Sequence, residues 1–295
     1  MIIDMNEIIS IYNDSVNNNL KMIENIIRSD IGLGDPHLME LFKETLQTSK
    51  NELVKKWRTG KKYLRTLAAV KAFPDYPVDS LKISISIDAI INILDDLLDE
   101  KLEKRAKNYY IVEIIRTLAN YHYQNNDEII RLCIGNYFNK CMTIAILEKH
   151  FYDLVRNENR EDELLKYLTY VYDIRSLDID VFIEIPLLES NIFHVKGDVL
   201  KAARSYRALE LIKKDFLDVE HDGDSGIDTL FTILWDREGA LLASVSSLTD
   251  QYLERIRNIT GSEDSNEIVK NFVVMSEVEA VEIGKYVRKS RLLKV

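Results

Sequence analysis

Residues 87–99 read IDAIINILDDLLD, and this stretch sets acidic side chains into an otherwise apolar segment. On a helix that turns about 100° per residue, its polar side chains fall within about 60° of one another, with Asp96 at the edge. These polar side chains belong to Asp88, Asn92, Asp95 and Asp99. Leu94 and Leu97 lie on the other side, so the stretch predicts a buried helix with one narrow acidic stripe.

This acidic stripe predicts a cation site. Carboxylates in a low-dielectric interior need a counter-ion. Asp95 and Asp99 have no histidine or cysteine nearby in the sequence, and such oxygen ligands suit Mg²⁺, which proteins often hold with one or two carboxylates plus substrate phosphates. We therefore predict a magnesium–diphosphate site. An exposed helix end is the alternative, because DDLLDEKLEKR (95–105) also has the composition of a solvated terminus.

Helical periodicity runs through most of the 295 residues, and only 4 prolines and 10 glycines interrupt it. The predicted fold class is all-α, with a single helical domain over residues 1–295. The alternation of Ile83, Ile85 and Ile87 with serines is typical of a strand, but the helical pattern around it favours a helix that starts at Asp79 or Ser80. The other expected helices cover residues 2–29, 37–58, 60–73, 108–122, 127–156, 161–175, 177–192, 196–222, 226–259 and 264–290.

The bulk composition excludes some classes of protein. A net charge of −10 argues against a general nucleic-acid binder, which normally has a basic face. The sequence contains no run of 18 apolar residues that could span a membrane, and no basic and apolar leader opens the printed chain. Cys133 and Cys141 lie eight residues apart on an expected helix, too far for a disulfide. We expect a soluble, cytoplasmic protein.

A second acidic cluster, KDFLDVEHD, covers residues 214–222. Its aspartates Asp215, Asp218 and Asp222 share one face of a helix within about 60°. The same face continues backward through the basic residues Lys214, Arg207 and Arg204. Facing helices of a bundle can build carboxylate metal sites, and guanidinium groups match phosphate oxygens. We predict a second metal site here, with arginines for a diphosphate; a solvated loop over EHDGDSGID (220–228) is the alternative.

A basic segment, TGKKYLRT (59–66), precedes both acidic clusters. Gly60, Lys61, Lys62 and Arg65 stand at the expected start of a helix, where backbone donors and cations together form an anion site. An ordinary lysine-rich surface is the alternative. A further basic cluster, YVRKSRLLK (286–294), is typical of a solvated tail.

Together these segments resemble the trans-isoprenyl diphosphate synthases, the family of farnesyl and geranylgeranyl diphosphate synthases. GKKYLRTLAAVKAF (60–73) resembles the segment of that family that binds the diphosphate of isopentenyl diphosphate. DDLLD matches its first aspartate-rich motif, with Lys104 and Arg105 where paired arginines follow, and KDFLDVEHDGDSGIDTL (214–230) resembles the region of its second motif. Arg175 lies near the position of the family's Lys-Thr pair. The resemblance spans about residues 55–291 and implies a helical bundle of the isoprenoid synthase type with a central cavity.

The resemblance implies Mg²⁺-dependent prenyl transfer, in which an allylic diphosphate condenses with isopentenyl diphosphate to a longer isoprenyl diphosphate, and it implies a homodimer. The implied catalytic residues are Asp95, Asp96, Asp99, Arg105, Lys214 and Asp215. The implied ligands of two or three Mg²⁺ ions are Asp95, Asp99, Asp215, Asp218 and Asp222. The implied diphosphate-binding residues are Lys61, Lys62, Arg65, Lys104, Arg105, Arg175, Arg204 and Arg207. Ile90 and Ile91 would limit product length from the pocket wall.

Two departures from the family pattern keep other functions open. Lys214 stands where the second motif has its first aspartate, and Leu211 stands where a glutamine precedes it. The spacing of Asp215, Asp218 and Asp222 also resembles the second metal motif of class I terpene synthases, which ionise an allylic diphosphate without isopentenyl diphosphate. The remaining alternative is a non-catalytic partner subunit of the same fold, in which Lys214 neutralises the acids without a metal.

Overall fold

The structure is a computed structural model that describes residues 65–77, 79–81, 83–84, 87–88, 91, 128–224, 229–234, 237–260 and 266–292. Helix accounts for 91% of these residues and strand for none of them, which confirms the all-α class. The chain divides into two compact units, one formed by Met1–Val70 and Asp75–Phe138, the other by Lys71–Pro74 and Asn139–Val295. The single domain over 1–295 stays a prediction from the sequence.

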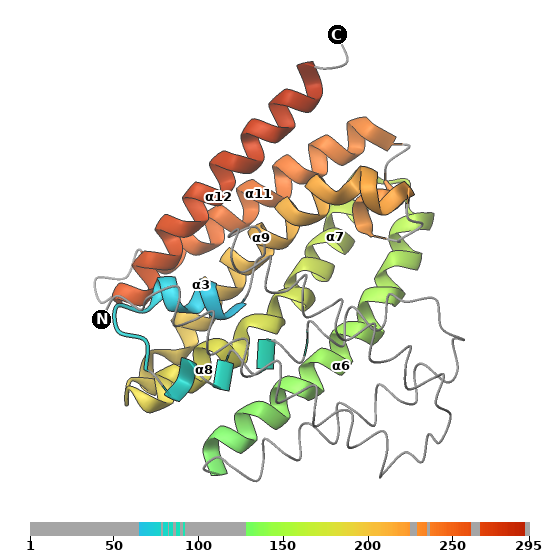
Figure 1. The fold of residues 1–295 in the computed structure, drawn as a ribbon. Helices are drawn as coiled ribbons and strands as arrows, with labels where there is room; N and C mark the ends of the chain where they lie inside the picture. Colours follow the sequence, from blue (N-terminus) through green and yellow to red (C-terminus); the bar gives the residue numbers. More distant parts are fainter. Residues whose placement is uncertain are drawn as a thin grey trace, which may run out of the picture. The chain divides into compact units, whose positions relative to one another are not determined.

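The second unit contains most of the described helices. They are α6 (Glu128–Asn157, from Asn139 onward), α7 (Glu161–Arg175), η1 (Ser176–Ile179), α8 (Asp180–Glu189), η2 (Phe193–Val195), α9 (Lys196–Asp224), α10 (Leu230–Ile233), α11 (Glu238–Thr260) and α12 (Glu267–Leu292). Helix α9 packs against α7, α8, α10, α11 and α12, and α11 and α12 also pack against each other (Figure 1). Helix α9 is therefore the element around which this unit is built.

The apolar face of α9 explains this central place. Ala208, Ile212, Phe216 and Val219 recur at helical spacing and are buried. The ring of Phe231 in α10 covers this face, with its centroid 6.3 Å from that of Phe216 and 5.9 Å from that of Tyr172 in α7. The other helices complete the core with Val155, Leu164, Leu168, Val171, Leu241, Val245, Leu248, Tyr252, Ile283 and Val287.

Several predicted helix boundaries agree with the structure, and one predicted helix is wrong. The range 161–175 matches α7, and α6 and α9 differ from prediction by one or two residues at their ends. The continuous helix expected over 226–259 is instead α10 and α11. Thr229 and Thr232 form a capping box at the start of α10, and Leu234, with φ −94° and ψ 0°, ends it after a single turn. The Arg237 N–H then donates to the Leu234 carbonyl at 2.8 Å.

The helix expected over 177–192 is also shorter than predicted, because a 3₁₀ turn precedes α8 and a turn at Asn191 follows it. Asn191 has φ 56°, the left-handed conformation that often ends helices. Its N–H donates to the Leu188 carbonyl at 3.1 Å, and the Ile192 N–H donates to the Leu187 carbonyl at 3.0 Å. These two bonds are the Schellman pattern, which satisfies carbonyls that the helix end leaves free.

In the first unit, the structure describes the start of α3 (Arg65–Ala72) and scattered helical residues between 79 and 91. Ile83, Ser84 and Ile87 are all helical, which confirms the choice of helix over strand for this stretch. The hydroxyls of Tyr76 and Ser84 lie 2.9 Å apart in a buried hydrogen bond. This contact holds the Tyr76 side chain against the helical residues that follow it.

Candidate functional site

The predicted site residues divide into two groups. Lys61, Lys62, Asp95, Asp96, Asp99, Lys104 and Arg105 lie outside the described residues. The structure places Arg65 in the first unit, and Arg175, Arg204, Arg207, Lys214, Asp215, Asp218 and Asp222 in the second. We describe the two units separately.

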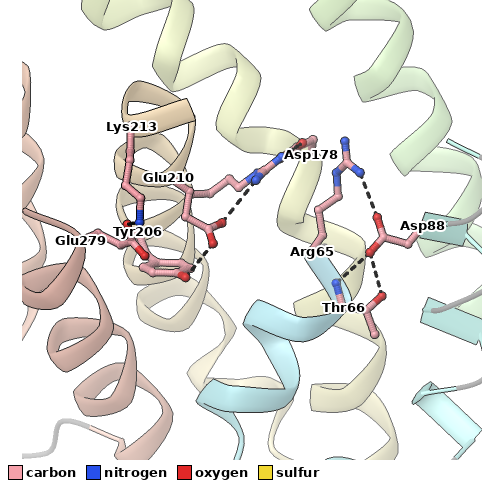
Figure 2. Close-up of polar contacts among 9 residues, drawn as sticks. Arg65, Thr66, Asp88, Asp178, Tyr206, Glu210, Lys213 and Glu279 are labelled. Carbon is pink, nitrogen blue, oxygen red and sulfur yellow. Dashed lines mark hydrogen bonds and ion pairs between the residues drawn. The ribbon is translucent and has the colours of Figure 1, made fainter. Parts of the chain in front are cut away.

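In the first unit, Asp88 binds the start of α3. Its carboxylate is fully buried and accepts a hydrogen bond from Arg65 Nη1 at 2.9 Å. It also accepts from the backbone N–H and the hydroxyl of Thr66, both at 3.1 Å (Figure 2). A helix N-terminus has unsatisfied N–H groups and partial positive charge, so a carboxylate is stabilised there. The first residue of the acidic stripe thus contacts the last part of the basic segment TGKKYLRT.

In the second unit, Arg175 and Asp215 form a buried ion pair between α7 and α9. Arg175 donates from Nη1 to Asp215 Oδ2 and from Nη2 to Asp215 Oδ1, the latter at 3.3 Å. The Tyr172 hydroxyl donates to Asp215 Oδ2 at 3.0 Å. On the other side, Arg175 Nε lies 3.2 Å from Glu148 Oε1 of α6, and the Tyr152 hydroxyl donates to the same oxygen. One guanidinium therefore holds two carboxylates from different helices.

Burial sets the ionisation of this group of residues. Burial raises the pKa of the Tyr172 hydroxyl well above its ordinary value, and the charge of Asp215 raises it further. Burial also raises the pKa of Tyr152, so both phenols stay protonated and donate. For Arg175, burial lowers the pKa, but the carboxylates of Asp215 and Glu148 outweigh it and raise the pKa well above its ordinary value. The guanidinium is therefore charged at every physiological pH.

Arg204 of α9 forms a second ion pair, with Asp180 at the start of α8. Arg204 donates from Nε and Nη2 to the two oxygens of Asp180 at 2.7 and 2.6 Å, and Lys140 of α6 donates to the same carboxylate. This hydrogen bond to Asp180 raises the pKa of Arg204. One turn further along α8, Glu184 lies 2.8 Å from Lys196. The two buried carboxylates of α8 are thus neutralised by cations from α6 and α9.

Arg207 forms a third ion pair one turn along α9, with Asp178 of η1. It donates from Nε and Nη2 to the two oxygens of Asp178 at 2.9 and 2.8 Å. Its Nη1 donates to Glu210 at 3.3 Å, and the Tyr206 hydroxyl donates to Glu210 at 2.7 Å (Figure 2). Burial raises the pKa of the Glu210 carboxyl, although Arg207 and Tyr206 oppose that effect.

These contacts give the three aspartates on the acidic face of α9 different surroundings. Asp215 is only 3% exposed and both of its oxygens accept from Arg175, whereas Asp218 and Asp222 are half-buried. Within the described part of the chain, Lys214 and Asp218 have no hydrogen bond or ion pair, and no group of three candidate metal ligands occurs. A Mg²⁺ ion needs free carboxylate oxygens. In this arrangement the three aspartates do not fit a second Mg²⁺ ion, and we derive no catalytic step through one.

Sequence reasoning missed the acids that pair with the predicted diphosphate-binding arginines. Glu148, Asp178 and Asp180 were not candidates, yet they bind Arg175, Arg207 and Arg204 respectively. A signal was present in SLDIDVFIEIPLL (176–188), where acids alternate with large apolar residues. Acids in such a stretch become buried with it, and a buried carboxylate needs a cation.

The comparisons with known proteins add no relative. No protein-family model, no curated protein and no solved structure matches this chain. None of the described helices is long and apolar enough to cross a membrane. The chain is therefore placed by its all-α fold, and the resemblance to the trans-isoprenyl diphosphate synthases rests on its sequence motifs.

Proposed function

We propose that this protein is a prenyltransferase that condenses an allylic diphosphate with isopentenyl diphosphate to a longer isoprenyl diphosphate. The observation that supports this proposal most is the contact of Asp88 with Arg65 and Thr66. It joins the basic segment, which would bind one diphosphate, to the acidic stripe, which would bind the other.

The basic segment and the acidic stripe both place their predicted diphosphate-binding residues a short distance along the chain from the contact between Asp88 and Arg65. Asp95 follows Asp88 by seven residues, about two helical turns or 10 Å on the helix that the sequence predicts. Lys61 and Lys62 precede Arg65 by four and three residues. Both segments thus extend from the same contact of Asp88 with Arg65. We infer that they hold the two diphosphate substrates near each other, and holding two reactants in position supplies a large part of catalysis.

The roles in this proposal follow from the chemistry of each side chain. Asp95 and Asp99, with Asp96 in support, would hold Mg²⁺, which stabilises negative charge on the leaving diphosphate. Arg105 and Lys104 would bind the same diphosphate, and Lys61 and Lys62 that of isopentenyl diphosphate. Arg65 is a positioning residue, since it holds the basic segment to Asp88. The apolar side of residues 87–99 would shelter an allylic cation from water.

Product analysis tests the proposal. The purified protein is incubated with Mg²⁺ and C5 to C20 allylic diphosphates, with and without isopentenyl diphosphate. A longer diphosphate that forms only with isopentenyl diphosphate is the expected result. Asp95→Asn should abolish it, while Asp162→Asn, an exposed acid in the first turn of α7, should leave it unchanged. Hydrocarbon or alcohol formed without isopentenyl diphosphate would instead establish a terpene synthase.

A non-catalytic partner subunit is the second candidate, and the ion pairs of α9 favour it. Arg175, Arg204, Arg207 and Asp215 all have charged partners inside the protein. A substrate diphosphate at α9 would have to displace a buried carboxylate, which leaves that charge unpaired. Thermal unfolding with Mg²⁺ and inorganic diphosphate separates the candidates, because a ligand of the native state raises its apparent stability. Absence of both a shift and turnover would favour the partner subunit.

A further inference from the structure

Polar side chains of α9 and α12 meet along the buried interface between these two helices. The ring of Tyr206 in α9 packs on that of Phe272 in α12, with 5.7 Å between their centroids. Lys213 Nζ in α9 lies 2.6 Å from Glu279 Oε2 in α12 (Figure 2). Each contact joins a residue of α9 to the residue 66 positions later in the chain. The two helices therefore run in the same direction here and keep one register over about two turns.

This register places Glu210 of α9 at the level of Ser276 of α12, between the two contacts. Glu210 is 4% exposed and Ser276 is fully buried. Glu210 accepts from the Tyr206 hydroxyl at 2.7 Å and from Arg207 Nη1 at 3.3 Å. The Ser276 hydroxyl has no hydrogen-bond partner within the described residues. At its own level, Glu210 thus meets a hydroxyl of α12 rather than a cation.

The two cations nearest to Glu210 along α9 are paired with other carboxylates. Arg207 donates from Nε and Nη2 to both oxygens of Asp178 in η1, and Lys213 binds Glu279. With Glu210 ionised, this set of residues contains three carboxylates and two cations. A buried charge without its own counter-ion is costly, so the ionised form of Glu210 strains this interface.

Charged side chains on the other elements packed against α9 are exposed or paired away from Glu210. Helix α10 contains no charged residue, and His194 of η2 and Asp250 and Glu254 of α11 are exposed. On α12, Glu282 lies 3.8 Å from Lys213. The remaining pairs are Arg175–Asp215 on α7, Asp180–Arg204 and Glu184–Lys196 on α8, and Arg255–Asp173 and Arg257–Glu277 on α11.

We propose that one proton on Glu210 controls how firmly α12 packs against α9. With the proton in place, Glu210 is neutral near Glu279, which lies one turn along α12 from the level of Glu210, and α12 stays packed. When the O–H bond breaks, the proton passes to water and its electron pair stays on the carboxylate. Glu210 and Glu279 then repel each other, one from each helix, and like charges across an interface weaken it. Helix α12 is therefore released more readily as the pH rises.

The ionisation of Glu210 gives the range of pH over which this happens. Burial raises the pKa of Glu210 above 4.5, Arg207 and Tyr206 lower it, and the charge of Glu279 raises it. Release of α12 removes this environment, so the released form ionises at a lower pH than the packed form. Release then becomes easier by up to about tenfold per pH unit from 4.5 to the folded-state pKa, and does not change above it.

This effect of pH is independent of the proposed prenyl transfer, because neither Glu210 nor Glu279 is a predicted ligand of substrate or metal. Amide hydrogen exchange of the full chain, followed by mass spectrometry and corrected for the intrinsic exchange rate at each pH, measures the release. Peptides from α12 should be less protected than peptides from α7. Protection of α12 should fall by up to about tenfold per pH unit over the range given above.

Two variants show whether Glu210 is the group responsible. Glu210→Gln keeps the size of the side chain and does not titrate, so the fall in protection of α12 should disappear. Glu277→Gln is the matched control, since Glu277 is an acid of α12 whose side chain is 48% exposed and pairs with Arg257. This control should keep the fall. A fall that is undiminished in Glu210→Gln, or an α12 as well protected as α7 at every pH, overturns the proposal.

Two further variants should move the pH range in opposite directions. Glu279→Gln removes the charge that raises the pKa of Glu210, so the fall should end at a lower pH. Tyr206→Phe keeps the ring against Phe272 but removes the hydrogen bond that lowers this pKa, so the fall should extend to a higher pH. Shifts of both variants in the same direction would contradict the proposed arrangement.

Infrared difference spectra follow the proton itself. The carboxylic-acid band of Glu210 is identified by its absence from Glu210→Gln, and it should disappear over the pH range in which α12 loses protection. Disappearance of this band while the protection of α12 stays constant would show that the proton leaves without releasing the helix, and it would overturn the proposal.

Discussion

Replacement of Asp215 separates a structural role for this residue from the metal-binding role that its spacing predicts. Asp215 is nearly fully buried, accepts two hydrogen bonds from Arg175 and accepts a third from Tyr172. Asp215→Asn keeps the shape of the side chain but removes its charge. Among the described residues, the guanidinium of Arg175 would then retain Glu148 as its one charged partner.

The size of the effect follows from this geometry. Removal of one partner of a buried ion pair costs about 3–5 kcal/mol, because the other charge stays buried without compensation. Asparagine still accepts one hydrogen bond and Glu148 remains, so we expect the lower end, about 3 kcal/mol of the free energy of unfolding. For a chain of this size that corresponds to a decrease of about 6–12 °C in Tm.

Chemical denaturation followed by circular dichroism measures this change without metal or substrate. Asp218→Asn is the matched control, since Asp218 lies on the same helix, is half-buried and has no ion pair within the described residues. We expect it to change the free energy of unfolding by less than about 0.5 kcal/mol. If Asp215→Asn is as stable as the wild type, and differs only in its response to Mg²⁺ with diphosphate, the ion-pair reasoning is wrong and Asp215 is a metal ligand.

Three further predictions concern other parts of the chain. Burial raises the pKa of Glu210 above its ordinary value of 4.5, so the folded state retains a proton that the unfolded state loses. As the pH rises from 4.5 through the folded-state pKa of Glu210, the wild type should therefore lose stability relative to Glu210→Gln. Measuring the free energy of unfolding of both proteins across that pH range tests this prediction. Asn191→Ala should destabilise the protein by about 1 kcal/mol because of the left-handed φ of 56°, while Asn191→Gly should not. Lys214→Asp should leave product formation unchanged, because Asp215 stays bound to Arg175 and the second motif does not fit a Mg²⁺ ion.

Each of these three predictions has an experimental result that would contradict it. A stability difference between wild type and Glu210→Gln that stays constant with pH would mean that the pKa of Glu210 is not raised. Equal unfolding midpoints for Asn191→Ala and Asn191→Gly would remove the conformational argument for the turn after α8. A rise in product formation with Lys214→Asp would show that the second motif binds a metal and that the lysine limits it.

Local pattern explains which helices could be predicted. The ranges found for α6, α7 and α9 agree closely with prediction because apolar residues recur at helical spacing and the helix ends carry ordinary signals. The break between α10 and α11 was missed because Leu230, Leu234 and Leu241 keep helical spacing on either side of the polar stretch DREG (236–239). Helix α10 ends at Leu234, with φ −94° and ψ 0°, and a helix end set by one residue leaves only a short signal in the sequence.

The sequence by itself determined the all-α class, the long helices and the faces on which Arg204, Arg207 and Asp215 lie, because these depend on neighbours within a few residues. Only the tertiary structure decided the partners of these residues. Asp215 meets Arg175 from 40 positions away, and Arg207 meets Asp178 from 29 positions away. Spacing along one helix shows which side chains share a face, but the charge opposite that face comes from whichever helix packs there.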